Sequence, residues 1–419
     1  MEPLFLGLDL STQKLKAVIV TERLDVVNEL SVDFDKDLPE FGTTNGVHVS
    51  RNEPKRITSP VRMWLKAVDL LLDKLEKRGL VGRIAAIGGC AQQHGTIYWS
   101  QIGTHSLTNL KPDVSLEEQL SSGFSIQDSP IWMDSSTCFE CKEFEDFVGG
   151  PEILSKITGS RAYYRFSGPQ ILKLFQQQRD AYRATARISL ISSFLCSLFA
   201  GKVVGIDLSD GSGMNLLDLR SKKWSKKLAG LIGDDLEEKL GDLKDNGSNW
   251  KISDYYVERY GFSPNCKVAT FTGDNPCILH FKILFRFFQR DFQLFKSDAK
   301  RDYSRRVQTR RLFRSEPWNA GWSKSHCIWI WMLAFCLLSQ TRVQRSRRWR
   351  RRRTHFARRK HEDLFAKRIN PRESSDFHWL LPHSWVPSGI TFVSERAYCN
   401  RAWHRFSIFN RAKKIGRRF

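Results

Sequence analysis

The stretch "LFLGLDLSTQKLKAVIV", residues 4–20, decides the fold because two apolar segments in it flank a short polar turn. The first segment is apolar with a carboxylate near its end, and the second is rich in β-branched side chains, which are both strand patterns. A further segment, "VVNELSVDF" at 26–34, alternates roughly in period two. Because the links are short and polar, we expect an antiparallel meander over residues 4–34.

A helix and further strands are predicted after this meander. Apolar side chains recur at helical spacing over residues 60–78, with Ser59 and Pro60 as start signals and Gly79 as a stop signal. A buried strand, "IAAIGG" at 84–89, then opens into the loop "CAQQHG". Later segments extend this pattern, namely helices at 138–147, 169–180 and 187–199 and a strand "KVATF" at 267–271 that leads into "TGDNP". The alternation predicts an α/β layered domain, whose sites gather at strand ends.

The basic charge of the chain is confined to its last third. The net charge is +22 over 419 residues, but residues 278–419 carry 34 Lys and Arg against 9 Asp and Glu. Residues 1–277 are therefore slightly acidic, and the overall charge does not by itself indicate a nucleic-acid partner. Two different compositions meet near Cys277.

Export and membrane insertion are not expected. The N-terminus has no basic region before an apolar stretch, so we expect no signal or transit peptide. The longest apolar run, "CIWIWMLAFCLL" at 327–338, is shorter than the roughly 20 residues needed to cross a bilayer. Nine Cys without framework spacing indicate free thiols, and the lone pair Cys138 and Cys141 is interpreted as two positions near a helical turn. We expect a soluble cytoplasmic protein.

Three polar segments could carry chemistry. The turn at 11–14 could cradle phosphate, with Asp9 holding a hydrated Mg²⁺, although most such turns are only turns. The amides and imidazole of "QQHG" at 92–95 suit a polyol, although a loop His is more often structural. Asp274 in "TGDNP" could take a proton from a sugar hydroxyl, or could simply cap a helix.

The chain resembles a known family through six short segments that occur in order over residues 1–276. These are "GLDLSTQ", "QQHG", "WMDSST" (132–137), "TGSRAYYRFSG" (158–168), "DLSDGSGMN" (207–215) and "FTGDNP" (271–276). Together they resemble the carbohydrate kinases of the FGGY family, and within it the eukaryotic branch that phosphorylates D-xylulose. The resemblance implies an actin-like, ribonuclease-H-like α/β fold, in which two domains close over a cleft that holds ATP and sugar.

The resemblance also implies roles for individual residues. Asp274 would be the general base that deprotonates the 5-hydroxyl of D-xylulose for in-line attack on the γ-phosphate of MgATP. The sugar would be held by His94, Arg165, Asp274 and Asn275, with Arg161 as a weaker alternative to Arg165. Asp9 would organise Mg²⁺, and the phosphate turn would consist of Ser11, Thr12 and Gln13. The implied partners are D-xylulose and ATP, with no specific nucleic acid and no membrane.

The resemblance stops at residue 276. The family's second, ATP-side domain should bring a Gly-Thr-Ser phosphate loop and a Gly-Gly adenosine loop, and residues 278–419 contain neither "GTS" nor "GG". We therefore expect a sugar-binding N-terminal domain at 1–276 and a nonhomologous, disordered Arg/Trp-rich tail at 277–419. We favour a shifted frame or a retained intron as the origin of this tail. A basic RNA-binding appendage and an interfacial membrane anchor are the alternatives.

The expected function is accordingly a carbohydrate kinase that converts D-xylulose to D-xylulose 5-phosphate, impaired here because the second domain is missing. One alternative is a nonenzymatic sugar- or nucleic-acid-binding protein that uses the basic tail. Another is a kinase of a different ketose or polyol.

Overall fold

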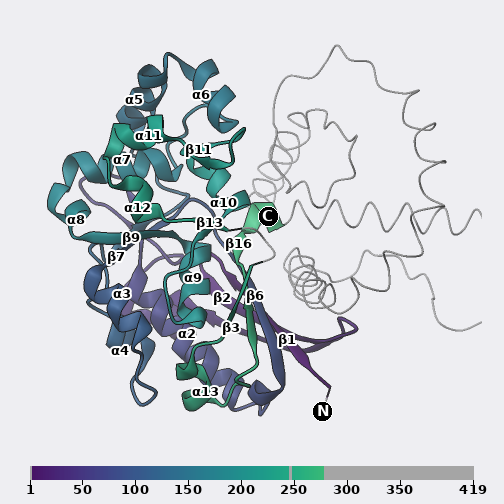
Figure 1. Cartoon of the computed structure of the whole chain (residues 1–419). Helices are drawn as coiled ribbons and strands as arrows, with labels where there is room; N and C mark the ends of the chain where they lie inside the picture. The colour runs from purple at the N-terminus through teal and green to yellow at the C-terminus, as the bar shows by residue number, and fades with distance from the viewer. Residues whose placement is uncertain (1, 245–247, 278–419) are drawn as a thin grey trace, which may run out of the picture.

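The structure is a computed structural model that describes residues 2–244 and 248–277, and a mixed sheet of seven strands lies in the half nearer the N-terminus (Figure 1). The strand order is β14-β15-β6-β1-β2-β3, and β16 also pairs with β6. The strands are β1 (Leu4–Leu10), β2 (Lys14–Thr21), β3 (Val26–Asp33), β6 (Ile84–Ala91), β14 (Asn249–Lys251), β15 (Lys267–Ala269) and β16 (Thr272–Gly273). β1, β2 and β3 form the predicted antiparallel meander, whereas β6 runs parallel to β1, β15 and β16. This mixed α/β architecture confirms the predicted fold class.

The first hydrophobic core joins the sheet to helices α2 (Val61–Glu76), α9 (Ile191–Ala200) and α13 (Asp254–Tyr260). The apolar stripe predicted over 60–78 is buried along α2. The predicted cap is wrong, because the Ser59 hydroxyl donates to the Gly46 carbonyl oxygen at 2.8 Å instead of capping α2. Gly79, at φ +66°, follows the helix end as expected.

A second core lies under a group of helices at the end of the molecule away from the N-terminus (Figure 1). It packs the strand pair β7 (Thr96–Ser100) and β9 (Thr185–Leu190) against α5 (Cys138–Val148), α6 (Pro151–Thr158), α7 (Ser167–Gln177), α11 (Lys226–Ile232) and α12 (Leu236–Leu240). The predicted helix at 187–199 is wrong in its first part, because 185–190 form β9 and pair antiparallel with β7. That pairing joins segments about 90 residues apart, which local periodicity does not report.

Shorter elements complete the described chain. The strands are β4 (His48–Val49), β5 (Ile57–Pro60), β8 (Asp128–Pro130), β10 (Ile206–Asp207), β11 (Leu217–Asp218), β12 (Lys223–Trp224) and β13 (Leu243–Lys244). The helices are α1 (Phe34–Asp37), α3 (Gln101–Thr108), α4 (Leu116–Leu120), α8 (Arg179–Arg183), α10 (Leu208–Gly211) and the 3₁₀ turns η1 (Pro39–Phe41), η2 (Val81–Arg83) and η3 (Ser212–Met214).

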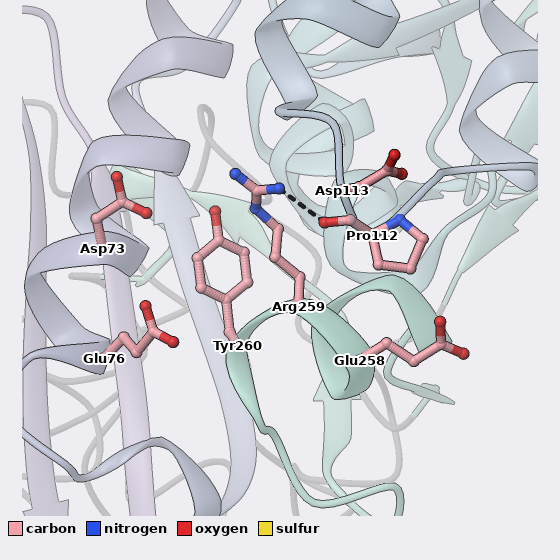
Figure 2. A pocket seen from close by; sticks show the side chains of 7 residues that line it. All are labelled: Asp73, Glu76, Pro112, Asp113, Glu258, Arg259 and Tyr260. Carbon is pink, nitrogen blue, oxygen red and sulfur yellow. Dashed lines mark hydrogen bonds between the residues drawn. The ribbon is translucent and has the colours of Figure 1, made fainter.

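An open acidic pocket of about 460 Å³ lies between the end of α2, the loop before α4 and α13 (Figure 2). The Arg259 guanidinium crosses it and donates to the Pro112 carbonyl oxygen at 2.7 Å, which ties α13 to that loop. In Figure 1, α13 lies at the N-terminal end of the molecule, whereas β16 lies near its middle. The pocket is therefore remote from the strand ends where the predicted site residues lie.

The expectations about the basic tail fall on residues 278–419, outside the described residues, so the tail's origin and the domain boundary stay predictions. Within the described part of the chain, no helix combines the length and apolarity needed to cross a membrane.

Candidate active site

Three neighbouring strands bring the predicted site residues to one edge of the sheet. β1 and β16 both run parallel to β6 and lie on either side of it, with Asp9 and Thr272 each in register with Cys90. Because the carboxyl ends of parallel strands meet at the same edge, Asp9, the loop 92–95 and Asp274 converge there. This convergence joins segments about 80 and 260 residues apart, and it places them where α/β folds usually hold their ligands.

Asp9 is buried at the end of β1 and holds the turn that follows it. Its Oδ2 accepts hydrogen bonds from the Ser11 hydroxyl at 2.6 Å and from the Lys16 ammonium at 3.2 Å. The Ser11 main-chain N–H donates to the Lys14 carbonyl at 3.0 Å, which closes the turn. Both polar groups of Ser11 thus stabilise the turn and the Asp9 carboxylate.

The remaining turn residues contact neighbouring loops. The Thr12 hydroxyl receives the indole N–H of Trp132 at 2.9 Å and donates to Gln92 Oε1 at 3.4 Å. The Gln13 amide donates to Asn45 at 3.4 Å and its side chain is exposed. Gly46 fits closely beneath the turn, since a Cβ there would lie 2.0 Å from the Thr12 carbonyl oxygen. At φ +77°, Gly46 also has a backbone conformation that other residues rarely adopt.

His94 lies in the loop between β6 and β7 with a left-handed backbone, at φ +72°. Non-glycine residues seldom adopt this conformation, and such strain concentrates at functional sites. The ring packs against Phe166, with centroids 4.8 Å apart, and is hydrogen-bonded to the main chain of Gly213. Burial, followed by the positive charge of Arg165, lowers the pKa of His94 to about 3. The imidazole is therefore neutral near pH 7, so that one ring nitrogen can donate and the other can accept.

The two arginines of "SRAYYRF" have different surroundings. Arg161 is committed to an ion pair, with its Nε 3.1 Å from Glu145 Oε1. Arg165 is exposed, lies 6.0 Å from the centre of the Tyr163 ring and is close enough to His94 to lower its pKa. The structure brings Arg165, and not Arg161, beside the loop that contains His94.

Asp274 follows β16 directly, at the start of the helical residues 274–277. It is partly buried and its carboxylate accepts the main-chain N–H groups of Asn275, at 2.9 Å, and of Gln93. Burial first, and then the charges of Asp9 and Asp210, raise the pKa of Asp274 to about 7. A carboxylate with this pKa can both accept and release a proton near neutral pH.

Two polar residues at this site were not predicted individually from the sequence. Gln93 accepts the Asn275 side-chain N–H at 2.8 Å and donates to Asp210 Oδ1 at 3.3 Å. Asp210 is buried, accepts the Ser192 hydroxyl at 2.5 Å, and burial raises its pKa to about 7. Both residues belong to segments that carry the family resemblance, "QQHG" and "DLSDGSGMN". Nothing in the sequence predicted that these two side chains are hydrogen-bonded to each other.

Magnesium would fit this edge only as a loosely held ion. The described residues contain no cluster of three or more His, Cys, Asp or Glu that could hold a metal. Mg²⁺ usually keeps several waters and binds through one or two carboxylates plus substrate phosphates. Asp9 and Asp274 are close enough for the charge of one to raise the pKa of the other, so the donor set suits that mode of binding.

Comparison with known proteins matches this architecture to one family. The N-terminal domain of the FGGY family of carbohydrate kinases matches residues 125–278. Xylulose kinase from Mus musculus is 51% identical over 276 residues, covering 65% of this chain and 50% of the relative. Xylulose kinase 2 from Arabidopsis thaliana is 47% identical over 277 residues, covering 66% and 50%. The predicted resemblance of residues 1–276 to FGGY kinases is confirmed.

A solved structure shares the fold. The crystal structure of a xyloylose kinase from Brucella ovis superposes with a TM-score of 0.53 at 20% identity, covering 65% of this chain and 49% of that one. The chain thus spans about half the length of the relatives that it matches.

Proposed function

We propose that this chain, whose residues 1–276 resemble the FGGY carbohydrate kinases, binds D-xylulose at the carboxyl edge of its sheet and transfers the γ-phosphoryl group of ATP to it. The observation that carries this proposal is the convergence of Asp9, His94 and Asp274 at one edge, with the pKa of Asp274 raised to about 7. The choice of D-xylulose as the sugar is inferred from the matched relatives, which are named xylulose kinases.

Asp274 would act as the general base. Its carboxylate takes the proton of the sugar's 5-hydroxyl, while that oxygen bonds to the γ-phosphorus and the bond from phosphorus to the β-phosphate oxygen breaks. D-xylulose 5-phosphate and ADP are the products. A base whose pKa lies near the working pH is ionised in a large fraction of molecules and still accepts a proton readily.

The sugar would be held by neutral and charged groups around the base. His94 remains uncharged and can accept or donate to a hydroxyl group, and Arg165 offers donors only. Asn275, exposed beside Asp274, adds an amide. Such positioning supplies much of the rate enhancement in phosphoryl transfer, because the chemistry itself requires little covalent help.

The phosphate side would rest on the turn of Ser11, Thr12 and Gln13, with Asp9 holding Mg²⁺ through water. When bound, the ion would neutralise charge on the phosphates. The ion pair with Lys16 holds the Asp9 carboxylate in place at the end of β1. Gly46, which has no Cβ, allows the Thr12 main chain of the turn to pack closely against it.

We further infer that turnover by this chain is slow. The sequence after Pro276 lacks the Gly-Thr-Ser and Gly-Gly segments that the resemblance implies for the second side of the cleft. Phosphate would then meet one loop in place of two, and the water-excluding closure of two domains would not occur.

The test uses the full chain with D-xylulose and MgATP, and measures ADP formation together with D-xylulose binding by calorimetry. We expect binding, slow sugar-dependent ADP formation, and a further loss of at least about 100-fold in Asp274→Asn. Asp180→Asn, an exposed carboxylate on α8, is the matched control. Full turnover in Asp274→Asn would remove the assigned base. Absence of D-xylulose binding, with binding of another ketose or polyol, would replace the substrate.

A further inference from the structure

A chain of four hydrogen-bonded side chains leads from the core to the proposed sugar site. Ser192 on α9 donates to Asp210 Oδ2 at 2.5 Å, and Gln93 Nε2 donates to Asp210 Oδ1 at 3.3 Å. Asn275 Nδ2 donates to Gln93 Oε1 at 2.8 Å. Ser192 and Asp210 are buried, Gln93 is 4% exposed, and Asn275 is exposed at the strand edge. The chain therefore begins in the core and ends at the surface that would meet the ligand.

The direction of these bonds is fixed by Asp210. Above about pH 7, where Asp210 is ionised, its carboxylate can only accept hydrogen bonds. The Gln93 side chain must then turn its NH₂ group toward Asp210 and its Oε1 toward Asn275. Asn275 must then turn its own NH₂ toward Gln93, and the same group lies 3.4 Å from Asp274 Oδ1. Both N–H donors of Asn275 thus have protein acceptors.

We propose that Asp210 is a positioning residue that, through Gln93, makes Asn275 present its side-chain carbonyl oxygen, and not its NH₂ group, to a hydroxyl donor of the sugar. The inference rests on the proposed function and deepens it, since it states which hydrogen-bonding role the bound sugar must play at this point. Among the described residues no hydrogen bond is made by Asn275 Oδ1, so this atom is available to a ligand.

A close backbone fit supports this role for Asp210. A Cβ on Gly273 would lie 2.5 Å from Asp210 Oδ1 and 2.6 Å from Gln93 Cγ. Asp210 and Gln93 therefore pack directly against the residue that precedes Asp274. Thr272 adds a second link, because its hydroxyl donates at 2.7 Å to Asp207, which also accepts the Asp210 main-chain N–H at 3.1 Å.

The experiment follows the side-chain amide of Asn275 by ¹⁵N NMR in the full chain, with Asn275→Asp used to assign its signals. In Asp210→Ala we expect these signals to move toward free-amide positions, and the affinity for D-xylulose to fall about tenfold, as expected for one lost hydrogen bond. Asp210→Asn should retain both properties, because its carbonyl oxygen can still accept from Gln93. Ser209→Ala, on the same short helix but outside the hydrogen-bonded chain, is the matched control and should change neither.

The outcomes separate this inference from the proposed function. If Asp210→Ala does not fold, Gln93→Met removes the same link and should have the same effect on the amide signals. Unchanged Asn275 signals in either variant would overturn the inference, as would an Asp210→Asn variant that behaves like Asp210→Ala. If the signals respond as expected but the unmodified chain binds no D-xylulose, the positioning holds and the proposed substrate is wrong.

Discussion

Asp9 at the end of β1 and Asp274 directly after β16 lie on either side of strand β6, and the charge of Asp9 raises the pKa of Asp274. The pKa of Asp274 is raised to about 7, first by burial, then by the charge of Asp9 and then by that of Asp210. The three-strand edge thus positions two carboxylates and also sets the pH at which one of them is ionised. This pairing has a direct experimental consequence.

Asp9→Asn should lower the pKa of Asp274. The substitution removes one of the two negative charges that raise this pKa, so Asp274 loses its proton more readily. The measurement is a pH titration of carboxyl carbons by ¹³C NMR, with Asp274→Asn used to assign the signal, because Asp9 is itself a proposed Mg²⁺ residue and activity would not separate the two effects.

Asp33→Asn is the matched control for this titration. Asp33 pairs with Lys14 at 2.9 Å on the neighbouring hairpin, and its removal should leave the Asp274 midpoint in place. An Asp274 midpoint that does not move in Asp9→Asn would show that the two carboxylates do not interact.

Gly46→Ala should weaken the binding of MgATP and leave D-xylulose binding unchanged. The new Cβ would meet the Thr12 carbonyl oxygen at 2.0 Å, so the phosphate turn must move. Gly42→Ala is the matched control, because Gly42 also has a positive φ, +61°, but no atom lies within 4 Å of its Cβ position. It should carry only the backbone cost, about 1–2 kcal/mol of stability. Calorimetric titrations with each ligand measure the difference, and equal nucleotide affinity in both variants would contradict the proposed role of the turn.

Asp69 should make the chain less stable as the pH rises from 4 to 6. It is buried on α2 and accepts the main-chain N–H groups of Leu116 and Glu117, both at 3.0 Å. Burial raises its pKa to about 6, above the unfolded value of 3.8, so the folded state retains a proton that the unfolded state has released. The free energy of unfolding then falls by about 3 kcal/mol across this window.

Urea unfolding at a series of pH values tests this expectation. Asp69→Asn does not titrate, so its stability should depend less steeply on pH between 4 and 6 than that of the unmodified chain. Other carboxyls contribute equally to both proteins and cancel in the difference. Asp180→Asn, which alters an exposed carboxylate, should keep the original slope. Parallel curves for Asp69→Asn and the unmodified chain would disprove the assignment.

The sequence pattern correctly predicted those strands and helices that are determined by residues close together in the sequence. The turn between Leu10 and Lys14 and the apolar stripe of α2 follow from alternation and helical spacing, and both are present. Ser59 has the residue type of a helix cap, but its hydroxyl is used by the Gly46 carbonyl, 13 positions away. The 187–199 prediction failed at its start because β9 is defined by its partner, β7.

The candidate site depends even more on contacts distant in sequence. Short sequence motifs and the family resemblance predicted Asp9, His94 and Asp274 as site residues. Gln93 and Asp210 are 117 positions apart, and no sequence spacing predicts the hydrogen bond between them. The Gln93 amide and the Asp210 carboxylate can be assigned to the site only once the fold shows that "QQHG" lies against "DLSDGSGMN".

Arg165→Ala should weaken D-xylulose binding and Arg161→Ala should not, although the two residues are only four positions apart. Arg161 forms an exposed pair with Glu145, and such pairs contribute about 0–1 kcal/mol, so its removal should slightly lower stability and leave D-xylulose affinity unchanged. Arg165 would donate to the sugar, so its removal should weaken D-xylulose binding about ten- to a hundredfold, as expected for a hydrogen bond from a charged group. The pKa of His94 should also rise in Arg165→Ala, because the nearby positive charge is gone, yet remain below its ordinary value because burial persists. Calorimetry and ¹H titration of the histidine ring measure both effects, and equal sugar affinity in the two variants would show that Arg165 does not contact the ligand.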